Sequence, residues 1–252
     1  MKNIFRKPES LAEKQPHYCP GCGHGIIHRI IGEVMDEFGI REKTIGVAPV
    51  GCSVFAYDYF NCDFSQAAHG RAPAVATGIK RADPEKIVFA YQGDGDLAAI
   101  GTAEIVHAAN RGENITVVFV NNAIYGMTGG QMAPTSIPGQ KTLTSPYGRD
   151  VKIAGNPILI SEMLSTLNGP AYIERTTIYN VKNIKKTKRA IKKAFDYQIR
   201  GLGFSMVEVV STCPTCWGIN PVDSMEWLKD NMLPCFPLGL YKDIEKEAKK
   251  DE

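Results

Sequence analysis

Five short apolar runs, separated by longer stretches with helical periodicity, constrain the fold of this chain more than any other feature. The runs are "TIGVAP" (44–49), "KIVFAYQ" (86–92), "ITVVFVNN" (115–122), "AYIERTTI" (171–178) and "FSMVEVV" (204–210). Near-continuous apolar strands are typical of parallel sheets that helices cover on both faces. Helices are expected at 25–38, 72–81, 97–110, 158–167 and 184–199. The sequence therefore predicts an α/β fold with a single open, mostly parallel sheet.

The predicted domain occupies the whole chain, 1–252. With 44% hydrophobic residues, a chain of this length can form one large core. An N-terminal arm that contains cysteines (1–25) and a C-terminal extension (212–252) are expected to flank the sheet. The aromatic and proline-rich segment 217–241 has three open interpretations: it covers a site, docks a partner or packs into the core. The charged stretch 242–252 is expected to be a frayed helix or a tail.

Charge and hydropathy exclude several classes of function. A net charge of +2 does not favour nucleic acid or an anionic membrane as a partner. The basic segment 182–195 is interpreted as the solvated face of an amphipathic helix. The start "MKNIFRKPES" lacks the apolar core of a signal peptide, and no apolar run approaches the ~18 residues of a membrane span. We therefore expect a cytoplasmic protein, in which seven cysteines favour a metal or cluster over disulfides.

The segment after the second apolar run combines features of a phosphate site and a metal site. Gly93 and Gly95 flank Asp94, so the backbone can turn sharply there, and a helix is expected to begin near Leu97. Asp94 would repel a phosphate unless it held a divalent cation that also binds the phosphate. Asn122 follows the next strand and supplies a second hard oxygen donor. The βαβ arrangement brings Asp94 and Asn122 together, which predicts a Mg²⁺ site.

The spacing of these residues resembles a known fingerprint. "GDGD" begins at 93 and "NN" at 121, a separation of 28 residues (121 − 93) with a helix and a strand between. This resembles the thiamine-diphosphate motif, in which GDG is followed by NN after some 25 to 30 residues. A nucleotide-binding loop is disfavoured, because "GDGDLA" lacks the third glycine of GxGxxG and no P-loop lysine follows.

The cysteine segments make the resemblance closer. With "CPGCGH", "GVAPVGCS", "AAHGRAPAVATGIK", "YQGDGD", "NNAIYGMTGGQ" and "STCPT", the chain resembles the β, thiamine-diphosphate-binding subunit of 2-oxoacid:ferredoxin oxidoreductases. The resemblance covers about 18–240 and is greatest for the 2-oxoisovalerate and 2-oxoglutarate groups. It implies three cofactors: thiamine diphosphate, Mg²⁺ and a [4Fe–4S] cluster.

The resemblance also implies the ligands of the diphosphate end. The Mg²⁺ ligands would be Asp94, Asn122 and the carbonyl of Ile124. The residues expected to bind the cofactor are Val50, Gly51, Cys52, Ser53, His69, Gly70, Gly93, Gly95, Asp96, Gly126, Met127 and Thr128. His69 and Arg71 flank a glycine and suit a diphosphate or a substrate carboxylate, although a loop histidine and a surface arginine are the alternative. The glutamate that activates the pyrimidine ring is expected on a partner subunit.

Four cysteines match the cluster ligands of the resembled family. They are Cys19, Cys22, Cys52 and Cys213, and four thiolates suit a cubane cluster. A zinc site made of two CxxC pairs, with Cys216 as the fourth ligand, is the alternative; its pairs lie far apart in sequence, and it leaves Cys52 unused. Cys62 and Cys235 are interpreted as buried or free thiols.

The resemblance implies an enzyme subunit. The expected activity is oxidative decarboxylation of a 2-oxoacid, with branched-chain acids favoured, to acyl-CoA and CO₂. Electrons would pass through the cluster to ferredoxin. The expected partners are an α subunit, γ and ferredoxin-like δ subunits, ferredoxin, the 2-oxoacid and coenzyme A. Alternatives are action on 2-oxoglutarate or pyruvate, a non-redox thiamine decarboxylase or carboligase, and a zinc-stabilised interaction protein.

Overall fold

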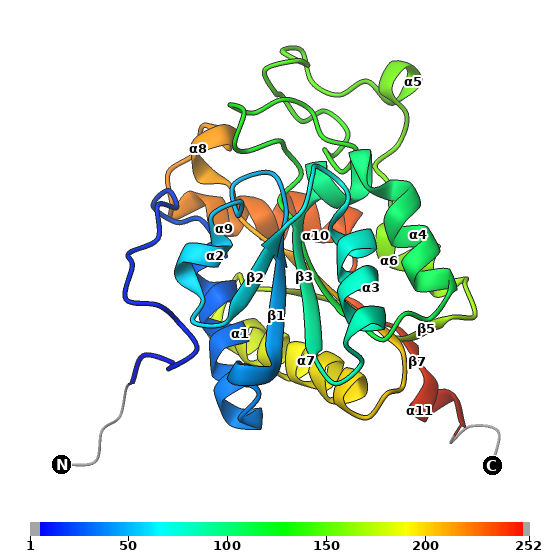
Figure 1. Ribbon diagram of the computed structural model, residues 1–252. Coiled ribbons are helices and arrows are strands. Elements are labelled where there is room, and N and C mark those ends of the chain that lie inside the picture. Colours follow the sequence, from blue (N-terminus) through cyan, green and yellow to red (C-terminus); the bar gives the residue numbers. More distant parts are fainter. Residues whose placement is uncertain (1–5, 249–252) are drawn as a thin grey trace.

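The structure, a computed structural model, describes residues 6–248 and contains one seven-stranded sheet (Figure 1). The strands are β1 (Thr44–Ala48), β2 (Asp63–Gln66), β3 (Ile87–Gly93), β4 (Thr116–Asn121), β5 (Pro170–Thr177), β6 (Phe204–Val210) and β7 (Gly239–Asp243). Their order is β2-β1-β3-β4-β6-β5-β7, and all neighbours are parallel except β5 and β7. The predicted open, mostly parallel sheet is confirmed.

Helices cover both faces of this sheet. The α-helices are α1 (His24–Phe38), α2 (Ala56–Tyr59), α3 (Ala72–Ala82), α4 (Thr102–Asn110), α5 (Val151–Ala154), α6 (Ile160–Ser165), α7 (Val181–Ile199), α8 (Pro214–Trp217), α9 (Asp223–Trp227), α10 (Leu233–Cys235) and α11 (Ile244–Ala248). A 3₁₀ turn, η1 (Arg41–Lys43), and two π-helical turns, η2 (Gly95–Ile100) and η3 (Leu228–Met232), complete the helical elements. Helices α1 and α7 share one apolar core with the sheet, and α3, α4 and α6 share a second core on its other face.

Strands β2 and β7 were not predicted from the sequence. Both lie at the edges of the sheet and are partly exposed, so neither contains a continuous apolar run. The expected helix at 97–110 also differs, because η2 is a π-helical turn and the α-helix begins only at Thr102. Gly101 lies between the two, and a Cβ there would stand 2.6 Å from the carbonyl oxygen of Gly70. The junction between the two therefore leaves no room for a side chain larger than that of glycine.

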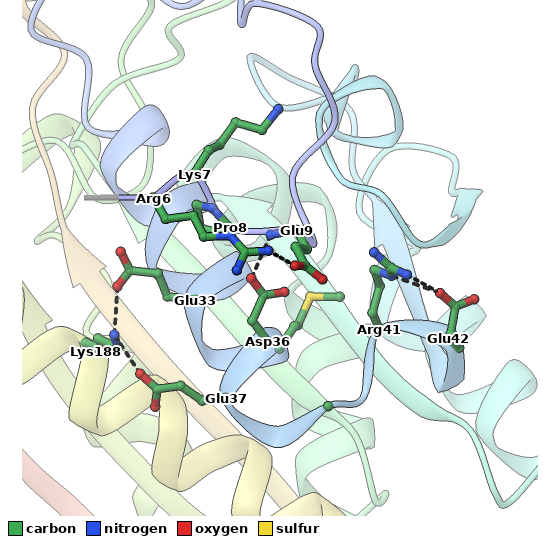
Figure 2. A pocket seen from close by; sticks show the side chains of 12 residues that line it. Arg6, Lys7, Pro8, Glu9, Glu33, Asp36, Glu37, Arg41, Glu42 and Lys188 are labelled. Carbon is green, nitrogen blue, oxygen red and sulfur yellow. Dashed lines mark hydrogen bonds and ion pairs between the residues drawn. The ribbon is translucent and has the colours of Figure 1, made fainter. Parts of the chain in front are cut away.

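The basic segment on α7 forms the predicted amphipathic face. Ala190, Ile191 and Phe195 are buried. Lys188 Nζ lies 2.7 Å from a carboxylate oxygen of Glu33 and 2.8 Å from one of Glu37, both on α1. Figure 2 shows these pairs at a surface hollow between the N-terminal arm, α1 and α7. The charges in this hollow are mostly paired, and it contains none of the predicted site residues.

The C-terminal extension forms a third, smaller apolar core. Leu228, Met232 and Phe236 are fully buried and pack against Ala123 and Val210 near the ends of β4 and β6. Of the three interpretations of segment 217–241, packing into the core is therefore the one that applies to these three side chains. Within residues 6–248, no helix is both long and apolar enough to cross a membrane.

Candidate active site

A cavity opens at the carboxyl ends of β1, β3 and β4, where ligands of open α/β sheets collect. Its lining comprises His24, Val50, Gly51, Cys52, Ser53, His69, Gly93, Asp94, Gly95, Asp96, Asn122, Ile124, Tyr125, Gly126, Met127 and Thr128. The structure thus brings together every predicted cofactor and Mg²⁺ residue except Gly70, whose N–H lies behind the lining and donates to Asp96 at 2.9 Å. Arg71 does not line the cavity and instead pairs with Glu104 of α4.

Asp94 is buried at the floor of this cavity, and its side chain caps η2. Its carboxylate accepts hydrogen bonds from Gly95 N at 2.8 Å, Asn122 N at 3.2 Å and Thr135 Oγ1 at 2.7 Å. Burial raises the pKa of Asp94 to about 6, since these neutral donors only partly offset the loss of water. Burial of a charged carboxylate that has no cationic partner costs free energy, and a bound divalent cation would offset this cost. Asp94 therefore fits the role of a Mg²⁺ ligand.

The turn that follows β4 presents the second candidate ligand. Asn122 Oδ1 accepts from Ile124 N at 3.3 Å, and its backbone carbonyl accepts from the indole of Trp217 at 3.0 Å. Ala123, which lies between Asn122 and Ile124, has φ 59° and is the one non-glycine residue with positive φ among residues 6–248. Strained backbone conformations of this kind occur most often at functional sites, where the surrounding contacts fix them.

Three residues of the long connection after β4 were missed by sequence reasoning. Thr135 donates to Asp94, and Ser136 Oγ and Gln140 Nε2 donate to the carbonyl of Ala123 at 2.6 and 3.0 Å. A threonine, a serine and a glutamine in a loop carry no recognisable pattern. Only the tertiary fold brings them against the turn.

Asp96 ties three segments of the site together. Its carboxylate accepts from Gly70 N at 2.9 Å, Val50 N at 3.3 Å and Gln92 Nε2 at 2.6 Å. His69 Nδ1 also lies 2.6 Å from its Oδ1. Both oxygens of Asp96 are thus engaged inside the protein, which positions the loops after β1 and β2 relative to η2.

Two glycines make room for close contacts in the cavity. A Cβ on Gly95 would stand 2.2 Å from the ring of Tyr125, so only glycine fits beneath that ring. A Cβ on Gly126 would stand 3.1 Å from Cys52 Sγ and 3.4 Å from Cys213 Sγ. Gly126 therefore marks the place where the cavity and two of the predicted cluster sulfurs meet.

The N-terminal arm brings the other two predicted cluster ligands to the same edge. Thr212, next to Cys213, donates from Oγ1 to the carbonyl of Gly21 at 2.7 Å, and Gly21 lies between Cys19 and Cys22. Cys216 is also close, with its Sγ 3.2 Å from the carbonyl oxygen of Gly126.

The thiols of the arm and of the sheet edge lie in a common, partly buried environment. Burial raises the pKa of Cys22 to about 11 and that of Cys52 to about 12, and the neighbouring thiols contribute to both shifts. Iron would offset this cost by stabilising the thiolates, so the thiol group fits a cluster. Within residues 6–248, no three thiol, imidazole or carboxylate groups are arranged to share one metal ion. In a cubane cluster each thiolate binds a different iron atom, so the four sulfurs lie further apart than the ligands of a single metal ion.

Two further histidines contact tyrosines near the cysteine pair of the arm, and two further cysteines lie in other parts of the fold. His24 Nδ1 is 2.6 Å from Tyr91 OH, and His17 Nδ1 is 2.6 Å from Tyr59 OH. The ring of Tyr18 stacks on His24. Cys62 packs against the first core and Cys235 against the third, and both are partly buried free thiols.

Comparisons with known proteins agree with the geometry of the site. Residues 49–209 match the family described as thiamine pyrophosphate enzyme, C-terminal TPP binding domain. The chain is 49% identical, over 98% of its length, to ketoisovalerate oxidoreductase subunit VorA of Methanothermobacter thermautotrophicus, and it spans 54% of that relative. It is 38% identical, over 93% of its length, to 2-oxoglutarate synthase subunit KorB of Methanocaldococcus jannaschii, of which it covers 84%.

A solved structure shows the same fold. It is the 2-oxoglutarate:ferredoxin oxidoreductase from Magnetococcus marinus with 2-oxoglutarate, coenzyme A and succinyl-CoA bound. The TM-score is 0.77 at 29% identity, over 96% of this chain and 86% of the other. Fold, cavity and relatives agree: the chain belongs to the family of thiamine-diphosphate-binding β subunits of 2-oxoacid:ferredoxin oxidoreductases.

Proposed function

We propose that this chain binds the diphosphate end of thiamine diphosphate through Mg²⁺. Asp94, Asn122 and the carbonyl of Ile124 would hold the metal, while the glycines at 93, 95 and 126 leave room for the phosphates. The observation that carries this proposal is the buried Asp94 carboxylate, which lines the cavity and has no cationic partner among residues 6–248. Bound there, thiamine diphosphate would act as the electron sink for decarboxylation of a 2-oxoacid.

We further propose that Cys19, Cys22, Cys52 and Cys213 hold a [4Fe–4S] cluster beside this cofactor. Support comes from the position of two of the sulfurs beside Gly126, where an added Cβ would meet both, and from the hydrogen bond by which Thr212 holds the arm at the same edge. Gly126 also lines the cavity, so cluster and cofactor would stand side by side. The cluster would accept the electrons one at a time and pass them to ferredoxin.

The proposed reaction is oxidative decarboxylation of a 2-oxoacid to acyl-CoA and CO₂. A branched-chain acid is favoured, because identity is 49% to the ketoisovalerate oxidoreductase subunit and 38% to the 2-oxoglutarate synthase subunit. Steady-state rates on a panel of 2-oxoacids, with a viologen dye as acceptor, test this choice. A higher kcat/KM for 2-oxoglutarate than for 2-oxoisovalerate would reverse it.

The site requires a partner subunit. Two carboxylates line the cavity, Asp94 and Asp96, and donors of this chain already engage both of them. A glutamate that activates the pyrimidine ring would therefore come from an α subunit, with γ and ferredoxin-like δ subunits completing the complex. Relatives that are themselves named as subunits support this assembly.

The experiment that tests the whole proposal is anaerobic purification of the chain with any partners that co-purify. We expect about four iron atoms per chain, absorbance near 400 nm and thiamine diphosphate that EDTA releases. A colourless protein with stoichiometric zinc would overturn the cluster assignment. Full-rate turnover by the isolated chain would overturn the need for a partner.

A further inference from the structure

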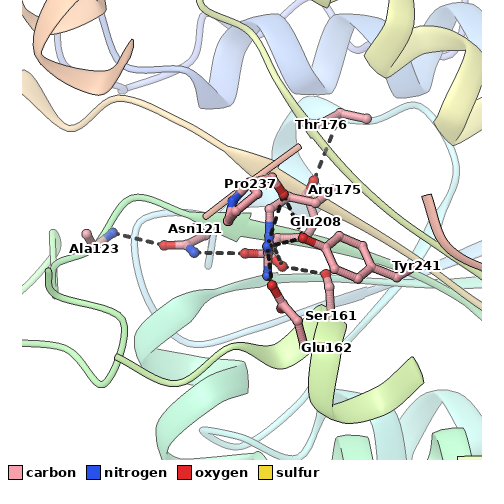
Figure 3. Close-up of polar contacts among 9 residues, drawn as sticks. All are labelled: Asn121, Ala123, Ser161, Glu162, Arg175, Thr176, Glu208, Pro237 and Tyr241. Atoms are coloured by element: carbon pink, nitrogen blue, oxygen red, sulfur yellow. Dashed lines mark hydrogen bonds and ion pairs between the residues drawn. The ribbon is translucent and has the colours of Figure 1, made fainter. Parts of the chain in front are cut away.

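A buried ion pair lies behind the candidate site, within the sheet (Figure 3). Arg175 of β5 and Glu208 of β6 are partners in register, and Arg175 Nε lies 2.8 Å from Glu208 Oε2. Their side chains are 0% and 1% exposed. Replacement of such a pair by apolar residues is often neutral or stabilising, so stability alone does not explain it. The contacts of Glu208 indicate another role.

Glu208 connects this pair to the turn that carries the metal ligands. Asn121 Nδ2 donates to Glu208 Oε1 at 2.8 Å, and Asn121 Oδ1 accepts from Ala123 N at 3.2 Å. Because the amide nitrogen of Asn121 is bound to Glu208, its amide oxygen must face the turn. The link therefore fixes both the orientation of this amide and the direction of the Ala123 N–H.

The register of the sheet builds this connection. Phe119 pairs with Glu208, and Asn121 lies two residues further along β4 on the same face. Ser161 Oγ donates to Glu208 Oε2 at 2.5 Å, so both oxygens of the carboxylate are held and its rotamer is set. These side chains are all buried, which makes each contact costly to lose.

The turn itself needs to be held. Ala123 adopts φ 59°, in the left-handed region that costs a non-glycine residue about 1–2 kcal/mol. Ser136 and Gln140 hold its carbonyl from one side, and Asn121 holds its N–H from the other. Without Asn121, Ala123 can relax, and the flanking Asn122 side chain and Ile124 carbonyl then lose their directions.

We propose that Asn121 and Glu208 are positioning residues for the metal site. They hold Ala123 in its left-handed conformation, and this aims Asn122 and the carbonyl of Ile124 at the cation. The inference rests on the proposed function, since it concerns the same Mg²⁺ site. It gives the buried carboxylate of Glu208, which does not line the cavity, a role in metal binding.

The test measures metal binding rather than turnover. The full chain, with any partners that co-purify, is stripped with EDTA and titrated with Mn²⁺ at fixed thiamine diphosphate, and free Mn²⁺ is followed by electron paramagnetic resonance. Loss of an outer contact of this kind typically costs 10–100-fold in metal affinity, and we expect a rise of about this size in the Kd of Asn121→Ala. Glu208→Gln, whose amide oxygen can still accept from Asn121, is expected to show a smaller rise.

Glu162→Gln is the matched control. Glu162 is the other carboxylate of Arg175, with Oε1 2.8 Å from Arg175 Nη1, and within residues 6–248 no hydrogen bond joins it directly to the turn. We expect its Kd for Mn²⁺ to stay near the wild-type value at a comparable loss of Tm. The inference is overturned if Asn121→Ala binds Mn²⁺ like wild type, or if Glu162→Gln weakens binding equally. If the wild-type protein itself binds no Mn²⁺ with thiamine diphosphate, the proposed function fails as well.

Discussion

Asp94 keeps its carboxylate in a buried site without a cationic partner, and this has a consequence for metal-free protein. Its pKa in the fold is about 6, above the ordinary value of 3.8. Between these values the folded state binds more protons than the unfolded state, so stability falls as pH rises through that range. The difference corresponds to about 3 kcal/mol of unfolding free energy.

We therefore expect EDTA-treated wild-type protein to lose stability between about pH 4 and pH 6 relative to Asp94→Asn, which has no such titration. Urea unfolding at several pH values measures the difference. Mg²⁺ with thiamine diphosphate is expected to remove the loss in the wild type and to have no effect on the variant. Parallel pH profiles of the two metal-free proteins would contradict this account of Asp94.

Gly126 is the residue at which a small substitution is expected to reduce iron binding. A methyl group there would stand 3.1 Å from Cys52 Sγ, closer than an ordinary contact, and 3.4 Å from Cys213 Sγ, and a packed site responds to such an addition by moving its neighbours. We expect Gly126→Ala to retain about half or less of the wild-type iron after anaerobic purification, measured by iron content and absorbance near 400 nm.

The control for this substitution is Gly78→Ala on α3, where a Cβ meets nothing within 4 Å. We expect it to keep its full iron content and to gain about 0.5–1 kcal/mol in stability, because alanine suits a helix better than glycine. Normal iron in Gly126→Ala would show that this glycine does not set the position of the sulfurs.

Candidate site residues could be picked out from the sequence where their pattern is local, and could not where it is distributed along the chain. The turn at Asp94 and the cysteine pair at Cys19 and Cys22 carry recognisable patterns of a few residues. Gln92, which holds Asp96, and Thr135, which holds Asp94, look like ordinary polar residues. Their roles depend on which segments the fold brings together, and this information is distributed over the whole chain.

At the scale of elements, burial decided which strands could be predicted. The inner strands β3, β4 and β6 are buried along almost their whole length and are therefore mostly apolar. The edge strands β2 and β7 have solvent on one side, so their sequences contain polar residues and no run stands out. The π-helical turn η2 ends at Gly101, which the chain passes closely at Gly70, and helical periodicity cannot indicate such a contact.

Strand β7 is anchored by a buried carboxylate at its end. Asp243 accepts from Lys193 Nζ at 2.5 Å and from Tyr197 OH at 2.6 Å, both on α7. Burial alone would raise the pKa of Asp243, but Lys193 and Tyr197 outweigh it and lower the pKa below its usual value. The contribution of this group to stability is thus present above about pH 4 and is lost as pH falls through the pKa in the fold.

We expect Asp243→Ala to lower the free energy of unfolding by about 1–3 kcal/mol at pH 7, since Lys193 and Tyr197 lose a buried acceptor. The gap to wild type is expected to close below about pH 4. Asp230→Ala, at an exposed carboxylate on η3, serves as the control and is expected to change stability by less than about 0.5 kcal/mol. A gap that persists at low pH would assign the effect of Asp243 to packing rather than charge.

On the scale of the whole molecule, the connection between β4 and α6 rises above the carboxyl edge of the sheet and carries α5 (Figure 1). Arg149 fixes its shape by donating to six backbone carbonyls. These belong to Ala133, Pro134, Ser136, Ala154, Gly155 and Asn156. The connection nevertheless exposes Leu143 (68%), Tyr147 (98%) and Ile153 (87%). A rigid segment with exposed apolar side chains is typical of a surface that a partner covers.

Because this surface adjoins the cavity for which we propose a glutamate from an α subunit, we expect that subunit to cover it. Tyr147→Asp combined with Ile153→Asp should weaken association with that subunit at least about tenfold, since buried apolar side chains dominate interface energies. Co-purification and sedimentation measure this, and the iron content should stay unchanged. Ile199→Asp, 42% exposed at the end of α7, is the control and should assemble normally. Normal assembly of the double variant would place the partner on another face, and reduced iron would indicate damage to the fold.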